Sequence, residues 1–112
     1  MKRGEIYFAD LDPTIGHEIK KRRPVLIVSN NASNKSSDLI TIVPITSNIS
    51  KVYPFEVFLT AIETDLPKDS KAQCHQIRTI SKSRIEHSKR AGYVQQSMDK
   101  IQSALKLHLD LE

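Results

Sequence analysis

Only one of the 112 residues, Cys74, is a cysteine, and this scarcity limits the chemistry that the chain can carry. A single thiol excludes a disulfide within the chain and a zinc site built from several cysteines. The polar segments that could carry chemistry, at residues 17–23, 46–51 and 73–79, contain neither paired carboxylates nor an HExxH motif. We therefore expect no metal site and no cofactor.

Long apolar runs are also missing. No segment is long enough to span a membrane, and the basic beginning MKRGEIYF lacks the apolar region of a signal peptide, so we expect a cytoplasmic protein that does not bind membranes. The sequence has no glycine-rich phosphate loop and no serine in a nucleophile elbow. Because it also lacks internal repeats, low-complexity segments and linker-like composition, residues 1–112 are expected to form a single domain.

Positive charge is in moderate excess. Seventeen Lys and Arg residues against thirteen Asp and Glu residues give a net charge of +4. This balance favours a polyanionic partner, which can be a nucleic acid, an acidic protein tail or an anionic lipid. The hydrophobic fraction of 38% is low for a small domain, so association with a second copy is expected to supply part of the burial.

The hydrophobic pattern predicts a small antiparallel β-barrel that ends in a helix. In the third expected strand, Pro44 is tolerable only at an edge or near a strand end. Short helical turns are expected within residues 30–38 and 82–94, and the apolar stripe Met98, Ile101, Leu105 and Leu109 predicts a helix after Ser97. Strands are expected at Gly4–Asp10, Pro24–Ser29, Leu39–Ile45, Pro54–Thr60, Ala72–Ile80 and Gly92–Val94.

Three polar segments are expected to meet at one end of such a barrel: His17–Arg23, Thr46–Lys51 and Gln73–Thr79. Together they supply a carboxylate, imidazoles, guanidinium groups, hydroxyls and amides. This set suits acid–base chemistry on a phosphate ester, in which arginine neutralises developing charge and a glutamate or histidine moves protons.

Four ordered blocks carry a family resemblance: MKRGEIYFADLDPTIGHE, RRPVLIVSN, VPITS and CHQIRTIS. They resemble the MazF/PemK toxins, with the Kid/PemK branch most similar around LDPTIGHE, and the resemblance runs from Arg3 to about Leu109. It implies a mainly β fold with α structure, an SH3-like barrel with a C-terminal helix of the MazF/PemK/CcdB type, that forms a homodimer. It also implies the toxin half of a type II toxin–antitoxin pair, silenced by an acidic antitoxin and binding operator DNA only together with that antitoxin.

The same resemblance implies a sequence-specific endoribonuclease that cleaves single-stranded mRNA without metal, through the 2′-hydroxyl next to the scissile phosphate. The family's catalytic arginine, threonine and glutamate fall on Arg23, Thr46 and Glu18, and the histidine of the PemK branch falls on His17. Residues expected to contact the RNA are Lys20, Lys21, Arg22, Ser47, His75, Gln76 and Arg78.

Two departures from the family pattern lie within these segments. Relatives commonly carry a glycine-containing stretch between the glutamate and the arginine, where this chain has Ile19–Arg22. PemK relatives carry an arginine and an aspartate beside the shared cysteine, where this chain has Gln73 and His75. The acid–base assignment of that branch therefore does not transfer directly, and either Glu18 or His17 can be the base.

Simpler interpretations remain for each residue. Arg23 can be a solvated cation at a strand start, Thr46 a turn hydroxyl, Glu18 an ion-pair partner and His17 an exposed loop residue. Gln76 and Arg78 can serve an interface, and Cys74 is expected to be a small buried apolar residue. At the level of function the alternatives are a CcdB-like gyrase poison, a nucleic-acid-binding module, and an inactive toxin with a structural role.

Overall fold

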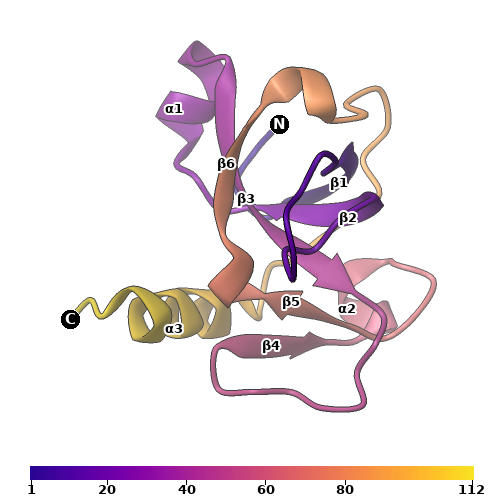
Figure 1. Cartoon of the computed structure of the whole chain (residues 1–112), viewed down its shortest axis with the longest axis vertical. Helices are drawn as coiled ribbons and strands as arrows, with labels where there is room; N and C mark the ends of the chain where they lie inside the picture. Colours follow the sequence, from indigo (N-terminus) through magenta and orange to yellow (C-terminus); the bar gives the residue numbers. More distant parts are fainter.

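The computed structural model describes all 112 residues, and an antiparallel sheet forms most of the fold (Figure 1). Six strands follow the order β4-β5-β3-β2-β1-β7, and β6 pairs with β3 off this path. The arrangement confirms the expected mainly β fold with a C-terminal helix. The elements are β1 (Glu5–Asp10), β2 (Arg22–Ile27), α1 (Asn31–Ser36), β3 (Leu39–Thr46), β4 (Glu56–Leu59), α2 (Ala61–Thr64), β5 (Ser70–Gln73), η1 (Cys74–Gln76, a 3-10 helix), β6 (Arg78–Ser81), η2 (Lys82–Arg84, also 3-10), β7 (Gly92–Tyr93) and α3 (Met98–Leu109).

The aliphatic run of β2 is buried on both faces of the sheet, as its sequence predicts. Leu26 and Val28, the residue just after β2, belong to one hydrophobic cluster, whereas Val25 and Ile27 belong to a second cluster on the opposite face. This division follows from the two-residue period of a strand, which points successive side chains to opposite sides. The sheet therefore separates two cores and fixes the strand ends that carry the polar loops.

β3 is the central strand and pairs with β2, β5 and β6. On one side of β3, Pro44 pairs with Val25 of β2. On the other side, β6 pairs with β3 as far as Ile42 and β5 pairs from Ile45 onward, so Pro44 lies between the two ladders. A proline has no N–H to donate to a ladder. β3 is not an edge strand, but Pro44 lies near its end, which is the other position that the sequence allowed, and where the neighbour on one side changes.

The expected strand Ala72–Ile80 is not continuous. Ile45 pairs with Ala72 and Ile42 pairs with Arg78. The chain therefore advances six residues from Ala72 to Arg78 while β3 advances only three. The 3-10 helix η1 takes up the difference. Strand alternation therefore does not govern its side chains, although Cys74 is fully buried, as expected, and burial raises the pKa of its thiol to about 12.

α3 packs against η1 and β4 (Figure 1). Ile101 is buried and Met98 and Leu105 pack on the first cluster, but Leu109 is 46% exposed, so the predicted stripe covers the core only over its first part. The sequence pattern also missed the short helix α2, whereas α1, η2 and β7 lie where helical turns and a strand were expected. None of the helices has both the length and the apolar character needed to cross a membrane.

Candidate active site

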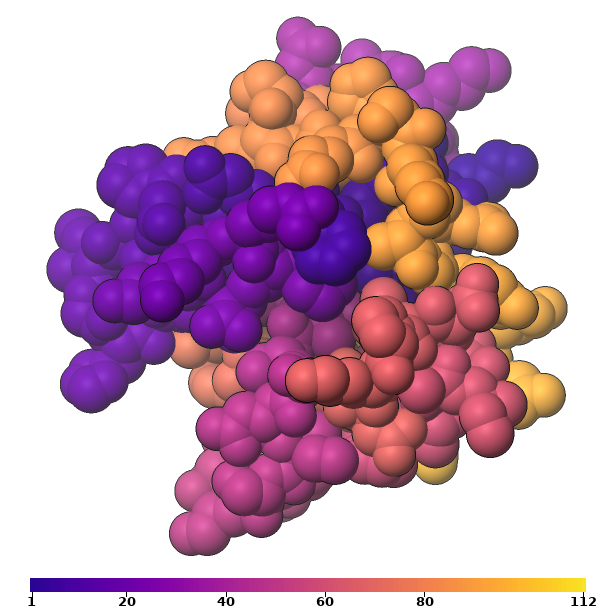
Figure 2. Space-filling model, turned by 90° about the vertical axis from the view of Figure 1, so that its right-hand side faces the viewer, coloured from indigo at the N-terminus to yellow at the C-terminus, as the bar shows by residue number.

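The loop between β1 and β2 lies over the ends of β3 and β5. Gln76 ties it down, since its Oε1 accepts a hydrogen bond from the Ile19 amide at 3.2 Å and its Nε2 donates to the His17 carbonyl at 3.4 Å. Arg78 donates from Nη1 to the Leu11 carbonyl at 3.2 Å. The loop before β2 projects to the left in Figure 2 and the magenta loop after β3 projects downward, and residues of both line one small cavity. The three polar segments thus meet.

Two hollows border this loop. A small cavity of about 220 Å³ is lined by His17, Ile19, Arg23, Thr46, Asn48, Lys71, Gln73 and Gln76. A wider one of about 510 Å³ is lined by Ile15, His17, Glu18, Ile19, His75, Gln76, Ile77 and Arg78. Because His17, Ile19 and Gln76 line both, the hollows adjoin, and we call them together the polar trough.

Arg23 reaches the small cavity from β2. Its backbone pairs with Ala9 of β1, and its Nε donates a hydrogen bond to the Lys20 carbonyl at 2.8 Å. The terminal guanidinium nitrogens have no hydrogen-bond partner within the protein, so they can donate to a ligand. A planar fork of this kind suits two oxygens of one phosphate.

Thr46 reaches the same cavity from the end of β3. Its Oγ1 accepts a hydrogen bond from the Asn48 amide at 3.2 Å, which is the turn geometry of the simpler interpretation. That bond leaves the hydroxyl proton available as a donor to a ligand. Thr46 can therefore stabilise this turn and donate a hydrogen bond to a substrate at the same time.

The two candidate bases differ in position. His17 lines both hollows and so lies with Arg23 and Thr46, whereas Glu18 lines only the wider one. The Glu18 carboxylate accepts a hydrogen bond from the Ile15 amide at 2.5 Å, within its own loop. Geometry therefore favours His17 beside the guanidinium and gives Glu18 a part in shaping the loop.

Arg22 lies away from the polar trough. Its guanidinium pairs with Glu86 at 2.5 and 2.9 Å and stacks 4.0 Å from the centroid of the Phe8 ring. Adjacent residues of a strand point to opposite faces, so Arg22 and Arg23 separate. The expected RNA contact of Arg22 therefore stays a prediction, and it would have to be made outside the trough. Lys20, Lys21 and Ser47 are exposed beside the trough and line neither hollow.

His75 borders the wider hollow but is held by aromatic neighbours. Its ring centroid lies 4.3 Å from that of Phe55 and 6.3 Å from that of His108. Burial lowers the pKa of His75, and its Nδ1 is buried without a hydrogen-bond partner. A neutral imidazole in this setting is suited to contacting a base or sugar rather than to holding a phosphate.

Three polar residues of the small cavity are not among the predicted site residues: Asn48 and Gln73, which lie within two of the expected polar segments, and Lys71, which lies outside all three. Lys71 is the most unexpected, because a lysine that is nine-tenths buried needs a partner. Its Nζ donates to Glu56 Oε1 at 3.0 Å and to the Lys51 carbonyl at 2.6 Å. The sequence carries no signal for Lys71, because its place in the site depends on the pairing of β5 with β3, which only the fold decides.

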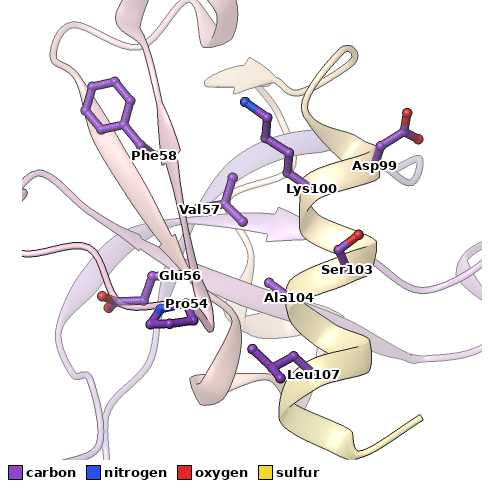
Figure 3. Close-up of a pocket in the computed structure, with 9 residues that line it drawn as sticks. All are labelled: Pro54, Glu56, Val57, Phe58, Asp99, Lys100, Ser103, Ala104 and Leu107. Atoms are coloured by element: carbon purple, nitrogen blue, oxygen red, sulfur yellow. The ribbon is translucent and has the colours of Figure 1, made fainter. Parts of the chain in front are cut away.

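A separate groove of about 490 Å³ runs between β4 and α3 (Figure 3). Phe58 and Leu107 lie at its borders, and Ala104 and Val57 face each other across it (Figure 3). None of the predicted site residues lines this groove. Nowhere in the chain do three or more His, Cys, Asp or Glu side chains group so that they could hold a metal ion.

The structure thus combines a mainly β sheet, a C-terminal helix and a polar trough formed where the loops meet. The model of PemK-like, MazF-like toxins of type II toxin–antitoxin systems matches residues 2–109, and the chain belongs to this family. Family membership confirms the resemblance seen in the sequence and does not favour the gyrase-poison alternative.

Relatives of known name agree in length as well as in sequence. The chain is 46% identical to "Endoribonuclease MazF9" of Mycobacterium tuberculosis, over 99% of this chain and 98% of that protein. It is 38% identical to "Endoribonuclease EndoA" of Bacillus subtilis, over 99% and 96%.

Solved structures share the fold. MazF of Deinococcus radiodurans superposes with a TM-score of 0.84 at 26% identity, over 99% of this chain and 97% of that one. A mycobacterial endoribonuclease in complex with its cognate antitoxin gives a TM-score of 0.79 at 27% identity, over 100% and 97%.

Proposed function

We propose that this chain is the toxin of a type II toxin–antitoxin pair and a sequence-specific endoribonuclease that cleaves single-stranded mRNA without a metal ion. The observation that carries the proposal is the convergence of Arg23 and Thr46, from neighbouring strands, on one small polar cavity bordered by His17. The names of the curated relatives support endoribonuclease activity.

The reaction needs no nucleophile from the protein. The 2′-hydroxyl of the substrate gives its proton to the base, its oxygen forms a bond to phosphorus, and the bond from phosphorus to the 5′-oxygen breaks. The 5′-oxygen takes up a proton, so the products are a 2′,3′-cyclic phosphate and a 5′-hydroxyl. Arg23 stabilises the charge that develops on the phosphoryl oxygens, and Thr46 positions the phosphate by a hydrogen bond.

His17 is the residue to which we assign the base, because it borders the cavity with Arg23 and Thr46. Glu18 shapes the loop through its bond to the Ile15 amide. Gln76 and Arg78, which line the wider hollow, and His75 beside them contact the bases that flank the cut. Lys20 and Lys21 add phosphate contacts from the exposed loop, and Ser47 extends the trough beyond Thr46.

The partners follow from charge and family. An acidic antitoxin segment covers the basic loop end of the barrel, as electrostatic complementarity favours for a chain of +4. The toxin acts as a homodimer in the cytoplasm and contacts operator DNA only together with the antitoxin. A solved relative in complex with its cognate antitoxin supports the protein partner.

The test uses purified protein, a long single-stranded RNA and EDTA. Cleavage is expected to persist in EDTA and to leave cyclic phosphate ends. An oligonucleotide with deoxyribose at the mapped cut site is expected to remain intact, because it lacks the nucleophile. Efficient cleavage of the deoxy-substituted oligonucleotide would contradict the mechanism, and activity that returns only on adding magnesium would contradict the metal-independent part.

A further inference from the structure

The small cavity holds a second cation that the family resemblance does not assign. Lys71 of β5 pairs directly with Thr46 of β3. Directly opposed residues of an antiparallel pair point to the same face, with their Cβ atoms about 4.5–5.5 Å apart. Lys71 therefore lies beside the threonine proposed to hold the phosphate, and both side chains line the cavity with Arg23.

Neighbouring groups hold the Lys71 ammonium in place. Its side chain is 9% exposed, and it donates to Glu56 Oε1 at 3.0 Å and to the Lys51 carbonyl at 2.6 Å. Glu56 is fixed in turn by the Tyr53 amide at 3.0 Å and by Gln73 Nε2 at 3.4 Å. A protonated lysine has three N–H donors, so one of them remains for a ligand.

A neighbouring residue of β5 points to a ligand independently. Gln73 lines the same cavity, and its Oε1 is buried with no hydrogen-bond partner. An acceptor in that condition costs free energy unless a bound molecule satisfies it. The cavity thus presents an unused ammonium donor and an unused amide acceptor next to the fork of Arg23.

We propose that Lys71 is a further catalytic residue, which donates its third N–H to the scissile phosphate and supplies a fixed positive charge beside that of Arg23. The proposal rests on the proposed function. The phosphate gains negative charge in the transition state, and a cation already held in place stabilises that charge without reorganisation. Gln73 Oε1 accepts a hydrogen bond from a hydroxyl or N–H of the bound RNA.

If the Lys71–Glu56 ion pair had only a structural role, its removal would have a different effect. Replacement of a buried ion pair by uncharged groups of similar size is often neutral or stabilising, so stability alone gives little reason to keep this lysine. A structural Lys71 would affect the folded fraction but not the rate of the folded enzyme. The rate per folded molecule therefore separates the two roles.

The experiment compares variants in which any buried charge that remains keeps hydrogen-bond partners. Glu56→Gln keeps the ammonium and an oxygen acceptor, and Glu56→Gln combined with Lys71→Met removes the ammonium without stranding a carboxylate. Single-turnover cleavage of the same RNA is measured for both, with thermal unfolding to show that each is folded. Glu56→Gln combined with Lys68→Met is the charge-matched control, because Lys68 is exposed and lines neither hollow.

The Lys71→Met double variant is expected to cleave about a hundredfold more slowly than Glu56→Gln, with KM changed by less than about tenfold. The Lys68→Met control is expected to match Glu56→Gln. Equal rates for all three would overturn the proposal. Wild-type protein and Arg23→Ala, run alongside, distinguish this failure from a failure of the proposed function, in which the wild type would not cleave or Arg23→Ala would cleave equally well.

A second measurement covers the case in which the double variant does not fold. The side-chain NMR signal of the Lys71 ammonium in the wild-type protein is followed while the uncleavable deoxy-substituted oligonucleotide is added. A shift of this signal on binding is expected. A signal that stays unchanged at saturation would overturn the proposal.

Discussion

Two neighbouring arginines show how much one residue step matters. Arg22 and Arg23 carry the same charge, but strand geometry directs the first to Glu86 and Phe8 and the second into the polar trough. Pro24 keeps the backbone at Arg23 extended, because the ring disfavours helical conformation in the residue before it. The pair therefore provides an internal control for the role of charge at the site.

We predict that Arg23→Ala folds normally and loses cleavage by about a hundred- to a thousandfold, since removing one transition-state donor typically costs that much. Arg23→Lys is expected to recover only a little, because an ammonium cannot grip two oxygens in one plane. The measurement is single-turnover RNA cleavage together with toxicity in cells.

Arg22→Ala serves as the control for this prediction. It removes an exposed ion pair, which contributes little to stability, and Arg22 lines neither hollow, so activity is expected to remain. Loss of cleavage in Arg22→Ala with activity retained in Arg23→Ala would contradict the assignment.

Lys20 and Lys21 are expected to add affinity without selecting the sequence, because exposed loop cations contact phosphates. In a double alanine variant, each lost contact should lower the slope of log affinity against log salt by about 0.7 for single-stranded RNA. Binding of the deoxy-substituted oligonucleotide at several salt concentrations measures this slope. An unchanged slope with a changed cleavage motif would refute the prediction.

At the scale of elements, the pairing of β4 with β5 connects the site to the stability of the protein. Burial by itself would raise the pKa of Glu56, but hydrogen bonds from the Tyr53 amide, Lys71 and Gln73 outweigh it and hold this pKa below its ordinary value of 4.5. A carboxyl whose pKa is lowered by folding stabilises the folded state above its unfolded pKa. That stabilisation is lost as the pH falls through the lower folded-state value.

We therefore predict that the wild-type free energy of unfolding falls as the pH drops below about 4.5, and that Glu56→Gln shows a smaller fall over the same range. Urea unfolding between about pH 6 and pH 3 measures both curves. At neutral pH the variant should be less stable, because the amide holds the Lys71 ammonium less strongly than a carboxylate does. Parallel curves for the two proteins would show that Glu56 is not the group responsible.

At the scale of the whole molecule, the apolar surface is uneven. Leu107, Leu109 and Leu111 are 59%, 46% and 60% exposed near the C-terminus, and Phe58 is 41% exposed beside the same groove between β4 and α3 (Figure 3). A low hydrophobic fraction together with a concentrated apolar face favours burial against a second copy of the chain.

We predict a dimer at micromolar concentration, and Leu107→Asp is expected to shift it toward monomer by placing a charge in the apolar contact. Sedimentation equilibrium measures the mass. Ile62→Asp is the control, because Ile62 is 96% exposed on α2 and does not line the groove. A wild-type protein that sediments as a monomer would remove the basis of this prediction.

The sequence alone determined the family, the mainly β class and the burial of β2, because these depend on local order: ordered blocks, aliphatic runs and a two-residue period. The family resemblance also placed Arg23 and Thr46 in the candidate site, and the structure brings both to one small cavity. The helix after Ser97 followed from its apolar spacing. All of these features are readable from neighbours within a few residues.

Tertiary structure decided the rest, because pairing between distant strands has no local signature. The segment between Ala72 and Arg78 has three residues more than the part of β3 that it faces, and this excess follows only from the pairing of β5 and β6 with β3. The position of Arg22 depends on Glu86, which lies 64 residues away. Lys71 enters the site only through its register with Thr46, since strand register, rather than composition, decides which side chains share a face.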